Sequence, residues 1–95
     1  MLDIFDVKLS GKASKDLKKV PLQIALKLAA WIEDVGNRGL TEVRKISGYH
    51  DEPLKGKRAG QRSIRLNKAY RAIYLITQNG VISFVEIQEV NKHDY

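Results

Sequence analysis

The chain has 95 residues, enough for one domain with one hydrophobic core. Its hydrophobic and charged fractions, 43% and 29%, are typical of a globular protein and exclude a disordered or collagenous chain. The absence of cysteine excludes disulfides and thiolate metal sites. The longest apolar run, 22–32, is far shorter than the roughly 20 residues that span a bilayer. The first ten residues carry two acids and do not predict a signal peptide, so we expect a cytoplasmic protein with no membrane partner.

The chain begins with the pattern of a strand followed by a helix start. Apolar and polar residues alternate loosely over 2–9, which predicts a half-buried strand. Ser14 stands two residues before Asp16, a combination typical of a helix N-terminus. We therefore expect the first helix to begin close to Ser14.

Apolar residues then recur every three or four positions over 17–35, which predicts a helical stripe facing a core. Pro21 interrupts this stripe, and proline fits best at the first position of a new helix. We predict two helices, over 13–19 and 21–35, with the second ending at the glycines of segment 36–39.

The second half of the chain predicts an antiparallel sheet. The segment 41–46 is either a further helical turn or an irregular connection, and a loop follows as far as Asp51. Three strands are expected over 61–66, 69–76 and 81–88. Asn67-Lys68 predicts a tight turn, and Asn79-Gly80 predicts a hairpin with a type I′ turn.

This element order, β-α-α-β-β-β, predicts a single α+β domain over 1–95. We expect a small antiparallel sheet of about four strands, with the N-terminal helical pair packed on one face. Alternation predicts that four apolar side chains point to the helices: Ile64, Leu66, Ile73 and Leu75. The opposite face would then be open and basic, and would form the substrate surface.

The positive charge of the chain is concentrated in segment 51–74. Seven cations lie there: Lys55, Lys57, Arg58, Arg62, Arg65, Lys68 and Arg71. The other ten Lys and Arg residues are balanced by the 11 Asp and Glu residues of the whole chain. A local field of this kind attracts phosphate groups and nucleic acid.

Several groups in and around this segment are candidates for a working site: the carboxylates of Asp51 and Glu52, His50, and the C-terminal residues 91–95. The chain has no phosphate-binding glycine loop and no zinc-protease motif, and its two histidines are not spaced as metal ligands, so we expect no metal and no cofactor. The groups present fit cleavage of RNA through its own 2′-hydroxyl. That reaction needs a base, cations around the phosphorane, and an acid for the departing 5′-oxygen.

Simpler interpretations stand beside this one. Glu52 before Pro53 also fits a solvated turn acid, and the cations also fit a phosphate-binding patch without catalysis. Tyr70 and Tyr74 are expected in the core or at its rim. The residues alone support a basic α+β domain that binds RNA.

The stretch HDEPLKGKRAGQRSIRLNKAYRAIY and the terminal KHDY resemble the RelE/ParE superfamily of type II toxin-antitoxin toxins, nearest to the RelE, YoeB and HigB-like mRNA interferases. The resemblance covers nearly the whole chain. It implies a RelE-like fold and a ribosome-dependent endoribonuclease that inhibits translation. The implied partners are a cognate antitoxin, the ribosome and mRNA.

The resemblance also implies roles for individual residues. Glu52 of EPLKG would be the general base, His93 of KHDY the general acid, and Arg71 of YRAIY would stabilise charge together with Lys55 and Arg65. The remaining candidates would contact RNA: Lys57, Arg58, Arg62, Lys68, Tyr95 and His50. His50 stands two positions before Glu52, so the choice between His50 and His93 as the acid is open at this point. A RelE-like mode of catalysis, in which lysines and arginines act in place of a Glu and His pair, is also open. The rival functions are a ParE-like inhibitor of DNA gyrase and a non-catalytic RNA-binding module.

Overall fold

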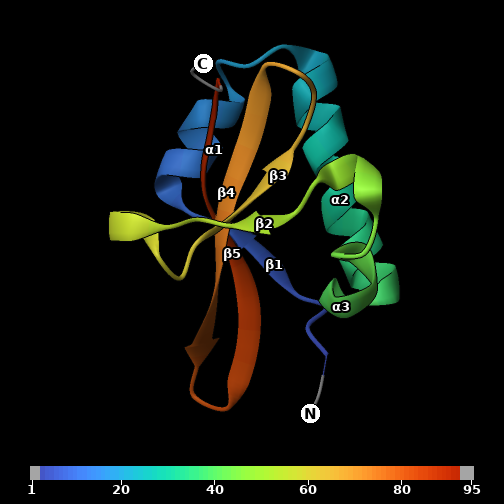
Figure 1. Cartoon of the computed structure of the whole chain (residues 1–95), viewed down its shortest axis with the longest axis vertical. Helices are drawn as coiled ribbons and strands as arrows, with labels where there is room; N and C mark the ends of the chain where they lie inside the picture. Colours follow the sequence, from blue (N-terminus) through green and yellow to red (C-terminus); the bar gives the residue numbers. More distant parts are fainter. Residues whose placement is uncertain (1–2, 93–95) are drawn as a thin grey trace.

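The fold follows the alternation of short helices and strands along the chain (Figure 1), and the computed structural model describes residues 3–92. The elements in chain order are β1 (Val7–Leu9), α1 (Gly11–Leu17), α2 (Leu22–Arg38), α3 (Leu40–Val43), the 3-10 helix η1 (Ser47–Tyr49), β2 (Glu52–Pro53), the 3-10 helix η2 (Gly56–Arg58), β3 (Arg62–Arg65), β4 (Tyr70–Asn79) and β5 (Ile82–Lys92). The predicted α+β class, with the helical pair on one face of the sheet, is confirmed.

The sheet has five strands in the order β1-β5-β4-β3-β2, one more than the four expected. The additional strand is β2, which lies just after the predicted loop in a stretch for which the sequence predicted no strand. It pairs antiparallel with β3 through Glu52↔Ser63 and Pro53↔Arg62. Pro53 lacks a backbone N–H and is tolerated because β2 lies at the edge of the sheet. The strand β1 pairs parallel with β5, whereas the other neighbours are antiparallel.

The first helix begins earlier than predicted because another serine caps it. The Ser10 hydroxyl accepts a hydrogen bond from the Ala13 N–H at 3.0 Å and donates one to the Gln88 carbonyl at 2.8 Å. The cap therefore also ties α1 to β5. Ser14 lies inside the helix, so the prediction that the helix starts there was wrong. Pro21 does separate the two helices, as the N-cap residue of α2.

The core lies between the helices and one face of the sheet. The strand register sets Ile64 opposite Ala72 and Arg62 opposite Tyr74, so Ala72 and Tyr74 share the helix-facing side with Ile64. The prediction that Ile73 and Leu75 face the helices was wrong by one residue, which reverses the whole face of β4. Tyr74 is fully buried, and its ring packs against Trp31 of α2 with centroids 5.3 Å apart.

A β-bulge in β5 interrupts the two-residue alternation of side chains between the two faces of the sheet. Ile73 pairs with Glu89, whereas the next residue, Tyr74, pairs with Ile87, so Gln88 is the extra residue. Ile87 and Val90 can both point into the core because of it, and both are buried. The same bulge leaves Glu89 on the opposite face.

The β4–β5 hairpin closes at Gly80-Val81, because Asn79 pairs directly with Ile82. Gly80 has φ 66°, whereas neither Asn79 nor Val81 has a positive φ. A type I′ turn needs positive φ at both central residues, so the predicted type was wrong. Positive φ at the first central position alone fits type II′.

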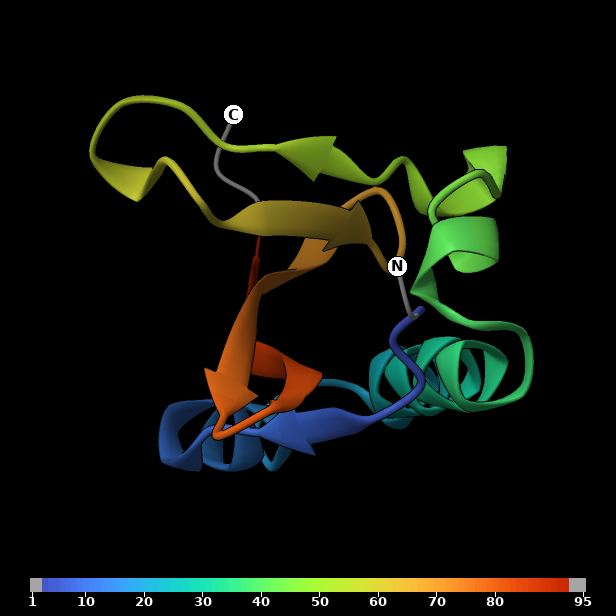
Figure 2. The ribbon, with the colours of Figure 1, turned by 90° about the horizontal axis from the view of Figure 1, so that it is seen from below.

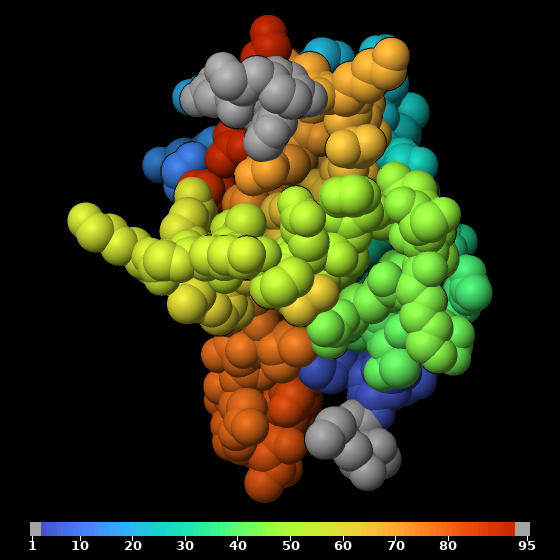
Figure 3. Space-filling view, in the orientation of Figure 1, coloured from blue at the N-terminus to red at the C-terminus, as the bar shows by residue number. Residues whose placement is uncertain are grey.

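The sheet is strongly twisted, so β2 and β3 lie at one end of the molecule and β1, α1 and α2 at the other (Figure 2). The segment from η1 to η2 runs as a continuous band across one face (green to yellow, Figure 3). Among residues 3–92, no helix is long and apolar enough to cross a membrane.

We predict that Gly39→Ala destabilises the domain. Gly39 has φ 86° and ψ 150°, a region that only glycine occupies readily, which costs other residues about 1–3 kcal/mol. A methyl group there would also collide with the Asp3 carboxylate, which accepts hydrogen bonds from the backbone and hydroxyl of Thr41 at 3.1 Å. Urea denaturation measures the loss. The matched variant Gly48→Ala, where no atom lies within 4 Å of the added Cβ, should change stability by less than about 0.5 kcal/mol. Equal effects would contradict the assignment.

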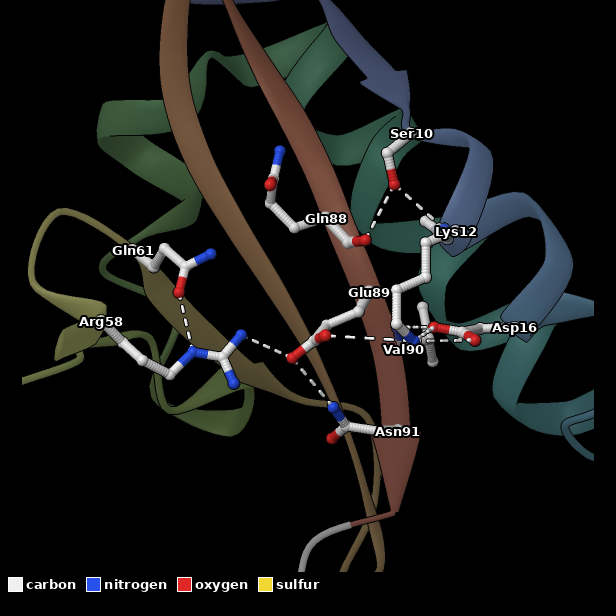
Figure 4. Close-up of polar contacts among 10 residues, drawn as sticks. Ser10, Lys12, Asp16, Arg58, Gln61, Gln88, Glu89, Val90 and Asn91 are labelled. Carbon is white, nitrogen blue, oxygen red and sulfur yellow. Dashed lines mark hydrogen bonds and ion pairs between the residues drawn. The ribbon is translucent and has the colours of Figure 1, made fainter.

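A second prediction concerns Asp16, which joins α1 to β5 (Figure 4). Burial raises the pKa of its carboxyl, but the Val90 N–H at 3.0 Å and the Lys12 ammonium lower it by more, so the pKa lies below the ordinary value. A depressed folded pKa gives stability that is present above the unfolded pKa of about 3.9 and is lost as pH falls through the folded pKa. Asp16→Asn should cost about 1 kcal/mol at pH 7 by urea denaturation and much less near pH 2.

The control for this prediction is Asp6→Asn, because the Asp6 carboxylate has no hydrogen bond or ion pair within residues 3–92. The free energy of unfolding of Asp6→Asn should equal that of the wild type at both pH 7 and pH 2. A loss for Asp16→Asn that stays the same from pH 7 to pH 2 would contradict the linkage.

Candidate active site

An open pocket of about 100 Å³ lies where β2, β3 and β4 adjoin. Its lining residues are His50, Glu52, Ser63, Ile64, Arg65, Asn67, Lys68, Tyr70 and Arg71. Its charged lining comprises one carboxylate, three cations and one imidazole. The structure thus brings together five of the residues predicted from the sequence.

The strand register explains why these charged groups share one face. Glu52 pairs with Ser63, and Arg65 pairs with Arg71. Side chains directly opposite each other point to the same side of a sheet, and so do residues two apart on one strand. Ser63 and Arg65 of β3 therefore place Glu52 and Arg71 on the open face, away from the helices.

His50 reaches the pocket through an uncommon backbone conformation. It follows η1 with φ 48°, in the left-handed region, and its N–H bonds to the Ser47 carbonyl at 3.1 Å. This turn leaves its Nε2 3.6 Å from Glu52 Oε2, with side chains 56% and 50% exposed. An imidazole and a carboxylate thus stand side by side in solvent reach, as proton exchange with a substrate requires.

The arginine pair is the main electrostatic feature of the pocket. Cβ atoms of directly opposite residues lie roughly 4.5–5.5 Å apart, so Arg65 and Arg71 repel each other. Within residues 3–92 neither guanidinium has a hydrogen bond or an ion pair with a carboxylate. An anion between them would relieve this repulsion.

Four lining residues were not predicted as site residues: Ser63, Ile64, Asn67 and Tyr70. The Asn67 side chain accepts hydrogen bonds from the N–H groups of Ala69 and Tyr70 at 2.7 and 2.8 Å, which shapes the β3–β4 turn beside the pocket. Ser63 could have been found from its alternation with Arg65. No alternation in the sequence pointed to Tyr70, because the face of the sheet on which Tyr70 lies depends on the register of β4 with β5.

Arg62, predicted to contact RNA, does not line the pocket. It is on the helix-facing side of β3, where its Nε donates to the Asp51 carboxylate at 2.6 Å. Arg62 faces the helices because it is two residues from Ile64 on the same strand, and this spacing is already visible in the sequence. Asp51 itself is 1% exposed, so it is a structural acid and is inaccessible to substrate.

The remaining predicted cations lie on the loop that joins β2 to β3. Lys55 and Lys57 are exposed and do not line the pocket. Arg58 donates to Glu89 at 2.5 Å and to Gln61 at 2.8 Å, so its charge is already compensated (Figure 4). The sequence gave no signal for this pair, because Glu89 reaches the open face only through the bulge in β5. His93 and Tyr95 lie outside the described residues.

The arginine pair generates a prediction for anion binding. Arg71→Gln should remove the repulsion and stabilise the free protein by about 0.2–1 kcal/mol, while abolishing stabilisation by phosphate. The measurement is the melting temperature in phosphate and in chloride at equal ionic strength. Arg38→Gln, at the exposed end of α2, is the charge-matched control and should keep the phosphate response of the wild type. Equal phosphate responses in both variants would contradict an anion site between Arg65 and Arg71.

Comparison with known proteins gives no matching family model and no matching curated protein. Solved structures do match along almost the whole chain. A YoeB/ParE toxin from Agrobacterium tumefaciens is 18% identical with a TM-score of 0.70, covering 94% of this chain and 99% of its own. YafQ from E. coli strain BL21(DE3) is 22% identical with a TM-score of 0.72, covering 93% and 92%.

A third match is the RelBE2 toxin-antitoxin complex from Mycobacterium tuberculosis, with 22% identity, a TM-score of 0.67, and 97% and 100% of the two chains covered. At these identities the likeness concerns the fold. The fold that the sequence motifs implied is confirmed: this chain has the RelE/ParE toxin fold, of the RelE, YoeB and YafQ type.

Proposed function

We propose that this chain is the toxin of a type II toxin-antitoxin system and that it cleaves mRNA bound to the ribosome. One observation carries the proposal: Glu52 shares an open pocket with an imidazole and three cations, two of which form the arginine pair. This is the set of groups that phosphodiester cleavage through the 2′-hydroxyl requires. The RelE/ParE fold supports the same assignment.

The chemistry assigns a role to each group. Glu52 takes the proton of the 2′-hydroxyl, and the oxygen attacks the adjacent phosphorus. The bond from phosphorus to the 5′-oxygen breaks, leaving a 2′,3′-cyclic phosphate, and an acid gives a proton to the departing oxygen. Arg65 and Arg71 stabilise the charge that develops on the phosphorane. Lys55 contributes a phosphate contact from the loop after β2.

An imidazole is the proposed acid, because a histidine pKa of about 6.5 suits proton donation near neutral pH. Two histidines are candidates. The sequence resemblance favours His93, whereas His50 lines the pocket, with its Nε2 3.6 Å from the Glu52 carboxylate. Separate substitutions decide between them.

The proposal includes the ribosome because the pocket is small and open. A general acid or base contributes about 10² to 10⁴ in rate, whereas positioning of the reacting atoms supplies roughly 7–11 kcal/mol. Because the pocket of about 100 Å³ is open, it would contact only one side of a bound nucleotide. The ribosome would supply the missing constraint by holding the codon, so naked RNA should be cut poorly.

A cognate antitoxin is the proposed protein partner. The similar solved structures include complexes of a toxin with its antitoxin, RelBE2 and DinJ-YafQ. The net charge of +6 on this chain would favour an acidic, amphipathic antitoxin segment that covers the basic surface.

The test is cleavage of ribosome-bound mRNA by purified variants, with mRNA ends mapped by primer extension. Glu52→Gln and Arg71→Ala should each reduce the cleavage rate by about 10² to 10⁴ because they remove the base and a charge stabiliser. His50→Asn and His93→Asn are compared to assign the acid, since asparagine tolerates the left-handed backbone of position 50.

The matched controls are Glu33→Gln and Arg38→Gln, two exposed positions of α2. Both should cut at the wild-type rate. Loss of ribosome binding together with cleavage, with a reduced salt dependence, would instead indicate a phosphate-binding module. If Glu52→Gln and Arg71→Ala cut as fast as the wild type, the nuclease assignment is wrong.

A further inference from the structure

The segment that carries His50 and Glu52 is held by very little backbone structure. The strand β2 comprises only Glu52–Pro53, at the edge of the sheet, and η1 ends at Tyr49. Leu54 donates one further backbone hydrogen bond to Gln61 at 2.9 Å. A short edge strand of this kind opens easily, so side chains must supply much of the constraint on the segment.

The side chains of the segment alternate between the core and the pocket. Tyr49 and Asp51 are turned inward, whereas His50 and Glu52 are turned outward. The Tyr49 hydroxyl donates to Asp34 at 3.0 Å, and burial together with Asp34 raises the pKa of Tyr49 to about 12. Asp51 is the inward residue that stands directly between the two pocket groups.

Asp51 is fixed by two donors from different strands. Its Oδ1 accepts from Arg62 Nε of β3 at 2.6 Å, and its Oδ2 accepts from the Tyr74 hydroxyl of β4 at 2.5 Å. The carboxylate is 1% exposed and Arg62 is 21% exposed, so this ion pair is largely removed from water. A buried carboxylate is tolerated only in a position where its partners satisfy it, so the pair admits few alternative arrangements.

The Tyr74 donor is itself immobile. Its ring is fully buried against Trp31, and Arg62 stands directly opposite it in the β3–β4 register. Burial and the neighbouring Asp51 raise the pKa of Tyr74 above its ordinary value, so the phenol keeps its proton across the physiological pH range. The contact connects the pocket segment to the helix–sheet core.

We infer that Asp51 is a positioning residue: held by Arg62 and Tyr74, it fixes His50 and Glu52 relative to each other and to the arginine pair. The inference rests on the proposed nuclease function, which it deepens. Asp51 does not touch substrate and exchanges no proton. Its contribution is to keep the carboxylate and the imidazole at the spacing seen in the structure, since misplacement by about 1 Å can cost 10²-fold in rate.

The primary test uses Tyr74→Phe, which deletes one hydrogen bond to Asp51 and keeps the aromatic ring against Trp31. We expect kcat for cleavage of ribosome-bound mRNA to fall about 10- to 100-fold, with KM within twofold of the wild type. Val85→Ala is the control for a general loss of stability, because Val85 is buried near the hairpin end of β4 and β5, opposite Ile76. It should leave kcat unchanged.

A double-variant cycle separates positioning from an independent effect. If Asp51 and Tyr74 act by positioning Glu52 and His50, Tyr74→Phe should slow Glu52→Gln by a much smaller factor than it slows the wild type. Equal fold-losses in both backgrounds would overturn the inference. So would an unchanged kcat in Tyr74→Phe while Glu52→Gln is inactive. Asp51→Asn, if it folds, should reproduce the kcat loss of Tyr74→Phe.

Amide hydrogen exchange gives a readout that does not depend on cleavage. The amides of His50 and Leu54, bonded to Ser47 and Gln61, should exchange at least about tenfold faster in Tyr74→Phe than in Val85→Ala. If the wild type cuts no RNA, the proposed function fails, and this measurement still decides whether Asp51 anchors the segment. Equal exchange in the two variants would show that it does not.

Discussion

The constraint on which this molecule depends is the two-residue alternation of β3. One face of this four-residue strand carries Arg62 and Ile64, and the other carries Ser63 and Arg65. Because β2 and β4 pair with it directly, the same alternation selects which of their side chains enter the core and which enter the pocket. A shift of one residue would exchange Arg65 for Ile64 and would place apolar groups in solvent and cations in the core.

This arrangement makes the pocket and the core two sides of the same strands. The core side is well packed, with Ile64, Ala72 and Tyr74 all buried under α2. The pocket side carries a like-charge pair that weakens the sheet by roughly a few tenths of a kcal/mol. The apolar burial is larger by about an order of magnitude, at roughly 1.5–3 kcal/mol for each large side chain, so the fold tolerates the repulsion between Arg65 and Arg71.

Much of the architecture could be predicted from the sequence because its signals are local. Pro21 separates the helices, Asn67 shapes a turn through its own side chain, and Gly80 closes the hairpin. The face of β4 could not be predicted, since Ala72-Ile73-Tyr74-Leu75 is apolar throughout and shows no period of two. Only its register with β3 decides that Tyr74 is inside.

The candidate site likewise has some features that could be predicted from local sequence signals and others that depend on strand register. Glu52, Arg65 and Arg71 were identifiable from motif and charge, but their convergence depends on pairings between strands that sequence periodicity does not specify. Arg62 was misjudged because its partner, Asp51, is a buried acid whose neighbours in the chain are exposed. A cation in a basic segment was assigned to phosphate, although the carboxylate that it pairs with, Asp51, stands eleven residues earlier in the same chain.

The Asp51 pair also shows how so small a domain can hold a precise site on an edge strand. Backbone pairing of two residues at an edge fixes their register, but it does not stop the strand from fraying. Asp51 connects the strand to Tyr74, and Tyr74 packs against Trp31. A single buried ion pair thus gives the pocket the rigidity of the core. The opposite wall needs no such device, because Arg65 and Arg71 pair directly with each other in the β3–β4 ladder, and Arg71 also pairs with Asn91 of β5.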